Sequence, residues 1–135
     1  MKPRLLLVDD EEMFLEFLSR RLIAYKYDVT ICLSGENAIE MTMKHDFDVV
    51  ILDVLMPGMD GIEALGEIKK IKPLTEVIML TGHASRESGI QGMKLGAYSY
   101  LSKLCDTEEL ITKINEAYDR KAEHEKRINI ASGHP

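Results

Sequence analysis

Five short apolar runs recur along this chain, and they restrict what it can fold into. Residues 4–8, 49–52 and 77–80 are nearly unbroken runs of Leu, Val, Ile and Met, and residues 29–33 and 98–101 are weaker runs of the same kind. Runs of four or five residues are too short for buried helices. They are typical of strands covered on both faces, as in a parallel sheet. Five buried strands are therefore expected.

Apolar residues at helical spacing lie between and after these runs. The five stretches predicted as helices are 14–25, 38–43 after a cap at Ser34, 62–71 with Pro73 just beyond its end, 85–95, and 110–118 after a cap at Thr107. Glu108 and Glu109 in the first turn favour the last of these, because acidic side chains stabilise a helix N-terminus. Strand and helix therefore alternate five times.

This alternation predicts an α/β fold. Crossovers between parallel strands are right-handed, so the helices come to cover both faces of one sheet. We expect a flavodoxin-like, doubly wound (βα)5 domain with a five-stranded parallel sheet over residues 1–121. Residues 122–135 are expected to be a helix extension that frays into a polar tail. There, Lys121 with Glu125 and Glu123 with Arg127 are candidate i,i+4 ion pairs.

Composition and charge exclude several classes of protein. With 45% hydrophobic residues the 135-residue chain is not disordered, and no apolar run approaches the roughly 18 residues of a membrane span. Acidic residues 9–12 interrupt any secretory signal, so a cytoplasmic protein is expected. The net charge of −6 argues against nucleic-acid binding, and two cysteines are too few for a zinc site or a disulfide framework.

Polar residues that follow the predicted strands mark the candidate site. Ligands of doubly wound folds bind outside the carboxyl ends of the strands. The first strand is followed by Asp9 and Asp10, the third by Asp53, the fourth ends at Thr81, and the fifth is followed by Lys103. Three carboxylates, one hydroxyl and one ammonium are thus expected on the same edge of the sheet.

This set of groups suits phosphoryl chemistry. Neighbouring carboxylates repel one another unless one is protonated or a cation lies between them, and an all-oxygen site suits Mg²⁺ or Mn²⁺. The cation and Lys103 would neutralise phosphoryl oxygens. Gly58 and Gly61 form no phosphate-binding P-loop, which leaves a carboxylate as the nucleophile. Asp53 is the favoured one, because Pro57 and these glycines predict a compact turn that exposes it.

Taken together, these residues resemble the receiver domain of two-component response regulators. The resemblance covers about Arg4 to Tyr118. It is carried by an ordered set of motifs, namely Asp9-Asp10, the run Asp53-Val54-Leu55-Met56-Pro57-Gly58-Met59-Asp60-Gly61, Thr81-Gly82, Gly96-Ala97, Tyr100 and Lys103.

The resemblance implies phosphorelay signal transduction, with Asp53 accepting a phosphoryl group from a sensor histidine kinase or phosphotransfer protein. Asp10, Asp53 and the Leu55 carbonyl would hold Mg²⁺, with Asp9 acting largely through water. Lys103 would pair with the phosphoryl oxygens. The movement of Thr81 and the inward turn of Tyr100 would switch the surface of the fourth helix, fifth strand and fifth helix, which controls a partner or output domain. Such a protein is not a turnover enzyme.

Some positions depart from the family pattern. Leu104 replaces the usual Pro after Lys103, which leaves a cis or a trans peptide open there. Leu55 and His83 occupy the positions that tune phosphoryl lifetime in this family. Leu55 cannot orient a water molecule, so slow to moderate hydrolysis is expected. His83 either assists that water or bonds the phosphoryl group, or it is a solvated loop residue.

Two other classes of protein fit these residues less well. A haloacid dehalogenase phosphatase needs a carboxylate two residues after its nucleophile, where this chain has Leu55. A flavodoxin-like redox carrier is disfavoured because Asp9 and Asp10 would repel the FMN phosphate. A phosphate-independent receiver-like interaction module stays open. So do a stand-alone protein, an N-terminal domain of a longer regulator, and dimerisation through the tail.

Overall fold

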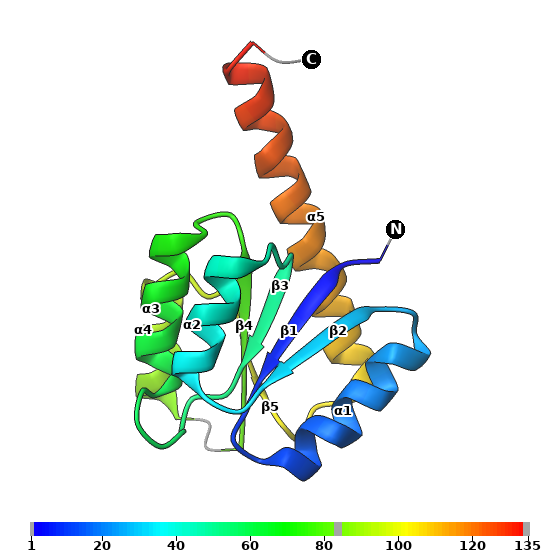
Figure 1. Cartoon of the computed structure of the whole chain (residues 1–135), viewed down its shortest axis with the longest axis vertical. Coiled ribbons are helices and arrows are strands. Elements are labelled where there is room, and N and C mark those ends of the chain that lie inside the picture. Colours follow the sequence, from blue (N-terminus) through cyan, green and yellow to red (C-terminus); the bar gives the residue numbers. More distant parts are fainter. Residues whose placement is uncertain (1, 83–84, 134–135) are drawn as a thin grey trace.

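The computed structural model describes residues 2–82 and 85–133, and its core is one five-stranded parallel sheet with the order β2-β1-β3-β4-β5. Figure 1 shows the sheet between two layers of helices. The strands are β1 (Arg4–Val8), β2 (Asp28–Cys32), β3 (Val49–Leu52), β4 (Glu76–Thr81) and β5 (Ser99–Ser102). The helices are α1 (Glu12–Ala24), α2 (Gly35–Lys44), α3 (Gly61–Ile71), α4 (Arg86–Lys94) and α5 (Thr107–Ala131). The doubly wound (βα)5 prediction is confirmed.

Alternate residues of each buried strand face opposite layers. Leu6 and Val8 of β1 belong to a core cluster that includes α2 and α3 residues, whereas Leu5 and Leu7 belong to a second cluster with α1 and α5. This division explains the unbroken apolar runs, because a strand covered on both faces has no solvent-facing positions. It leaves the strand ends as the place where polar side chains can gather.

The helix boundaries mostly follow the predictions. The Ser34 side chain caps α2 by accepting a hydrogen bond from the Asn37 backbone N–H at 3.1 Å, as predicted. The predicted cap at Thr107 is wrong. Thr107 is the first residue of α5, and Asp106 precedes it without a side-chain capping bond. Periodicity locates a helix within a turn, but it does not distinguish between two adjacent polar residues.

The last helix extends further than expected. Residues after Lys121 were expected to fray, yet α5 runs without a break to Ala131 and projects beyond the sheet (Figure 1). Both predicted ion pairs are present, Lys121 to Glu125 at 3.3 Å and Glu123 to Arg127 at 3.4 Å. Such pairs add helix stability one turn apart, and no Gly or Pro interrupts the helix before Gly133.

The base of this projecting helix is fastened to the sheet by charged side chains. Glu76, at the start of β4, is buried and forms a forked pair with the Arg120 guanidinium, whose Nη2 lies 3.0 Å from Oε1. Lys69 of α3 also reaches Glu76 at 3.7 Å, and Lys121 pairs with Asp48 at 3.2 Å. A buried carboxylate needs such partners, so these contacts set the direction in which α5 leaves the domain.

Within the described residues no helix combines the length and apolar character needed to span a bilayer.

Gly61 marks a point of very close backbone approach beside the end of β3. Its N–H donates to the Val54 carbonyl at 2.7 Å, and a Cβ added to it would lie 1.9 Å from the Asp53 carbonyl oxygen. No side chain fits there, and the clash would be with backbone rather than with a flexible side chain. This contact therefore helps to fix the turn that follows Asp53.

We predict that Gly61→Ala lowers the free energy of unfolding by about 1–3 kcal/mol or more, as overpacking does. Gly66→Ala in the same helix is the matched control. Nothing lies within 4 Å of its added Cβ, and Ala in a helix interior is favoured over Gly by about 0.5–1 kcal/mol. Urea unfolding followed by circular dichroism measures both changes. Equal stability of the two variants would contradict the close-approach argument.

Candidate functional site

Four strands bring the predicted site residues together at the carboxyl ends of the strands. Asp9 and Asp10 follow β1, Asp53 follows β3, Thr81 ends β4, and Lys103 follows β5. Backbone hydrogen bonds between adjacent strand ends hold them in place. The Asp53 N–H donates to the Val8 carbonyl at 2.9 Å, and the Lys103 N–H donates to the Thr81 carbonyl at 3.0 Å. Parallel pairing therefore places these residues side by side.

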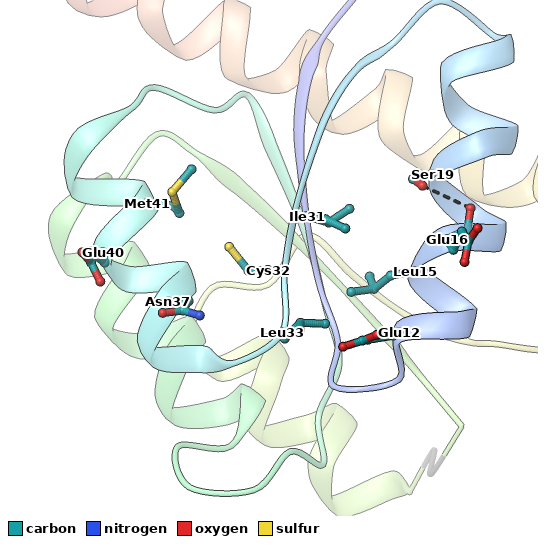
Figure 2. Close-up of a pocket in the computed structure, with 10 residues that line it drawn as sticks. All are labelled: Glu12, Leu15, Glu16, Ser19, Ile31, Cys32, Leu33, Asn37, Glu40 and Met41. Carbon is teal, nitrogen blue, oxygen red and sulfur yellow. Dashed lines mark hydrogen bonds between the residues drawn. The ribbon is translucent and has the colours of Figure 1, made fainter.

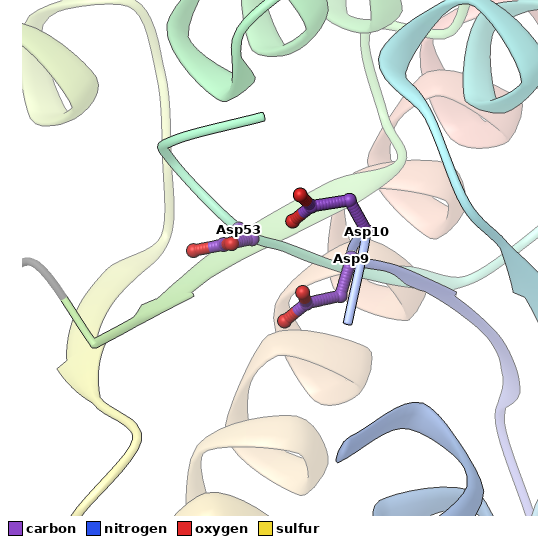
Figure 3. A group of neighbouring side chains, drawn as sticks. All are labelled: Asp9, Asp10 and Asp53. Carbon is purple, nitrogen blue, oxygen red and sulfur yellow. The ribbon is translucent and has the colours of Figure 1, made fainter. Parts of the chain in front are cut away.

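The three aspartates form one cluster. Each offers a carboxylate oxygen, and these oxygens lie within 4.8 Å of one another. Asp9 and Asp53 are buried, whereas Asp10 is exposed. Figure 3 shows the three side chains extending from the neighbouring ends of β1 and β3. A set of hard oxygen donors with one face open to solvent has the chemistry of a Mg²⁺ site, so the donor set fits such an ion.

The Asp53 carboxylate lies in an environment that disfavours its charge. Burial, and then the negative charge of Asp9, raise the pKa of Asp53 above its ordinary value. A hydrogen bond with Thr81, the charge of Lys103 and the Val54 N–H, which donates to Oδ1 at 2.8 Å, act in the opposite direction. The net raised pKa means that a cation would stabilise the ionised form strongly.

Lys103 supplies the positive charge of the site. Its Nζ lies 2.7 Å from Asp9 Oδ2, 2.5 Å from Glu11 Oε1 and 3.7 Å from Asp53 Oδ2, and it also lies over the Phe14 ring. Burial alone would lower the pKa of the Lys103 ammonium, but its contacts with Asp9 and Glu11 raise that pKa overall. The ammonium is therefore held between carboxylates within reach of Asp53.

Thr81 and Tyr100 connect this edge of the sheet to α4. Thr81 is fully buried, and its hydroxyl bonds the Asp53 carboxylate. The Tyr100 ring is partly buried beside Gly89, and its hydroxyl accepts a hydrogen bond at 3.0 Å from the backbone N–H of Ser85, which caps α4. The side chain predicted to move is thus attached to the start of α4.

Leu55 and Leu104 are two further positions that depart from the family pattern. The Leu55 side chain, two residues after Asp53, is 53% exposed. His83 lies outside the described residues. The structure contains no cis peptide among the described residues, so the Lys103–Leu104 peptide is trans. Leu104 is almost fully exposed.

A groove elsewhere on the protein is separate from this cluster. It has a volume of about 710 Å³ and lies between α1 and α2 at the β2 edge of the sheet (Figure 2). Apolar side chains such as Leu15, Ile31 and Met41 line it, together with Glu12, Glu16 and Glu40. None of the five predicted site residues contributes to its walls.

Glu11 is the site residue that sequence reasoning did not assign. It precedes α1 directly, and its backbone N–H donates to Asp9 Oδ1 at 2.9 Å. Its side chain reaches across the mouth to Lys103, 92 positions away in the sequence. The signal for it was weak, because it was only a third acidic residue after the Asp9-Asp10 pair.

Comparison with known proteins agrees with this geometry. A family model described as the response regulator receiver domain matches residues 5–115. The chain belongs to this family. Receiver domains generally bind Mg²⁺ at an acidic pocket and work with histidine kinases and output domains.

Individual relatives show what share of a full-length regulator this receiver domain covers. The probable transcriptional regulator ycf29 of Porphyra purpurea is 36% identical over 116 residues, 84% of this chain and 56% of that protein. The transcriptional regulatory protein GlrR of Escherichia coli K12 is 35% identical over 122 residues, 90% of this chain and 28% of GlrR. A CheY-like receiver domain protein from Methanospirillum hungatei superposes with a TM-score of 0.87 at 28% identity, covering 92% of this chain and 99% of that one. The receiver domain thus spans about half or less of these curated relatives.

We predict a pH-dependent effect of Asp53→Asn on the stability of this receiver domain in metal-free buffer. A carboxyl whose pKa is raised on folding costs nothing below its unfolded-state pKa of about 4. Its penalty grows as pH rises from there to the higher folded-state pKa and is constant above that. Asn removes that penalty. The variant should therefore gain stability relative to wild type between acidic and neutral pH, measured by urea unfolding across that range. A difference that does not change with pH would contradict the raised pKa.

Proposed function

We propose that this receiver domain accepts a phosphoryl group on Asp53 from the phosphohistidine of a sensor histidine kinase or a phosphotransfer protein. The observation that carries the proposal is a buried carboxylate flanked by Asp9, Asp10, Thr81 and Lys103. Only Asp53 of the three aspartates combines burial, a bond from a hydroxyl and an ammonium at 3.7 Å. Those groups are suited to stabilising a phosphoryl group attached to its oxygen.

We further propose that Asp10 and Asp53, with the Leu55 carbonyl, hold Mg²⁺, and that Asp9 does so largely through water. Mn²⁺ fits the same hard oxygen ligands. When bound, the ion would neutralise charge on the acceptor and on the transferring oxygens. The mutual proximity of the three carboxylates supports this assignment, since bringing them together without a cation is costly.

The transfer step uses groups already in place. An oxygen of ionised Asp53 attacks phosphorus, and a P–O bond forms as the donor's P–N bond breaks. The imidazole nitrogen leaves with the bonding electron pair and takes a proton from solvent. The Lys103 ammonium, 3.7 Å from Asp53, pairs with the new phosphoryl oxygens.

Tyr100 and Thr81 are proposed to pass this event to a surface. If Thr81 turns from the Asp53 carboxylate to a phosphoryl oxygen, it vacates space next to the core, and the Tyr100 ring can enter it. That movement breaks the bond between the Tyr100 hydroxyl and Ser85 at the cap of α4. The α4-β5-α5 surface would then change its shape, and this change would control a partner or an output domain.

Exposed apolar side chains on α1 and after β5 are suited to docking the donor protein. Met13 and Phe17 of α1 and Leu104 after β5 are all more than half exposed. Phe17 also lines a small pocket with Cys105 and Asp106, so the start of α1 and the β5–α5 loop adjoin. Exposed apolar side chains on two adjoining segments favour a protein donor.

Other activities fit the geometry less well. A phosphatase would need an acid–base carboxylate at position 55, and this chain has an exposed Leu there. We propose that the domain accepts one phosphoryl group per cycle and does not turn over a substrate. Because the curated relatives are transcriptional regulators, we also propose a cytoplasmic role in which other parts of such a regulator bind DNA.

We predict that acetyl phosphate with Mg²⁺ adds one phosphoryl group to the wild-type protein and none to Asp53→Asn, as read by intact-protein mass. Chelation of Mg²⁺ should abolish the adduct. Asp119→Asn, an exposed carboxylate on α5, is the matched control and should behave as wild type. No adduct on the wild type, or an adduct on Asp53→Asn, would refute the proposal.

We predict that Leu55→Asn shortens the phosphoryl half-life by roughly two- to tenfold, because an amide can orient a water molecule towards phosphorus and an alkyl side chain cannot. Leu33→Asn, exposed at the groove between α1 and α2, is the control and should leave the half-life unchanged. Loss of the mass adduct over time measures both. A wild-type half-life of seconds, or no effect at position 55, would show that Leu55 does not slow hydrolysis.

A further inference from the structure

The shortest contacts of the Lys103 ammonium are not with the phosphoacceptor. Nζ lies 2.5 Å from Glu11 and 2.7 Å from Asp9, but 3.7 Å from Asp53. Lys103 is mostly buried, whereas the Glu11 side chain is 65% exposed at the mouth of the site. The ammonium is therefore drawn from the acceptor towards the entrance by a carboxylate outside the aspartate cluster.

Backbone geometry keeps Glu11 in this position. It is the residue before α1, in an extended conformation, and its N–H is bonded to Asp9. Its side chain extends from there to the residue that follows β5. The cluster of candidate metal ligands comprises Asp9, Asp10 and Asp53 without Glu11. Glu11 is thus placed to act on Lys103 and not on the ion.

We propose that Glu11 is a positioning residue that restrains Lys103 in the unphosphorylated state and must release it when a phosphoryl group arrives. The inference rests on the proposed function of Asp53. Two effects act in the same direction. Glu11 competes with the phosphoryl oxygens for the ammonium, and its negative charge repels the incoming dianion once the pair has separated. Glu11 therefore limits how readily the domain is phosphorylated.

The test compares three variants. Glu11→Gln removes the charge and keeps the size, while Glu11→Asp keeps the charge and shortens the side chain so that it no longer reaches Lys103. Glu12→Gln is the matched control, since it removes one negative charge at the next residue, and none of the ion pairs of Lys103 involves Glu12.

Two readouts follow each variant. The first is the initial rate of phosphorylation by acetyl phosphate at saturating Mg²⁺, from intact-protein mass. The second is the affinity for beryllofluoride with Mg²⁺, followed by ¹⁹F NMR. Beryllofluoride coordinates a carboxylate oxygen and becomes tetrahedral there, so it imitates the phosphoryl group without a leaving group. If Glu11 restrains Lys103 before the ligand binds, its removal changes both the phosphorylation rate and the beryllofluoride affinity. An effect on the leaving group would change only the rate.

We expect Glu11→Gln to raise both the rate and the beryllofluoride affinity by about two- to fivefold, the range of an ion pair with one exposed partner. Glu11→Asp should gain part of this increase, because it loses the contact with Lys103 but keeps the negative charge. Glu12→Gln should stay at the wild-type level. The inference is overturned if Glu11→Gln and Glu12→Gln behave alike, or if Glu11→Asp behaves as wild type. If the wild type itself takes no phosphoryl group with Mg²⁺, the proposed function fails first, which is a distinguishable result.

Discussion

The repulsion among three carboxylates at one end of a parallel sheet is the constraint on which the rest of this structure depends. Two of the three are buried, so neither solvent nor distance relieves the repulsion, and the pKa of Asp53 is raised as a consequence. Lys103 provides the compensating charge from the opposite side of the site. A doubly wound fold can arrange this because every strand delivers its last residue to the same edge. The apolar faces of the strands leave the strand ends as the places for such charges.

Backbone contacts, more than side-chain packing, fix the relative positions of the site residues. Asp53 is bonded to β1 through its own N–H, Lys103 to the end of β4, and the turn after Asp53 is fixed by the close approach of Gly61. The acidic and basic groups are thus placed by hydrogen bonds between uncharged backbone groups. Side-chain contacts then decide how the charges are shared, as the competition of Asp9, Glu11 and Asp53 for one ammonium illustrates.

Much of this could be predicted from the sequence. The strands were found because runs such as residues 49–52 are apolar at every position, and the site residues because they follow those strands. Three features were missed for physical reasons. Asp106 and Thr107 are adjacent polar residues at the start of α5, and a periodic apolar pattern cannot tell which of them precedes the helix. The length of α5 depends on ion pairs in a polar segment that has no apolar stripe. The contact of Glu11 with Lys103 joins distant segments through flexible side chains.

The long last helix has a mechanical consequence. Its final buried residue is Ala117, and its attachment through Arg120 and Lys121 lies close to that point. The segment from Lys121 to Ala131 extends beyond these attachments by about 15 Å at 1.5 Å per residue. A tilt of about 10° at its base would move the tip by roughly 2–3 Å. The helix is thus a lever, and a rearrangement too small to disturb the sheet becomes a large displacement at its end.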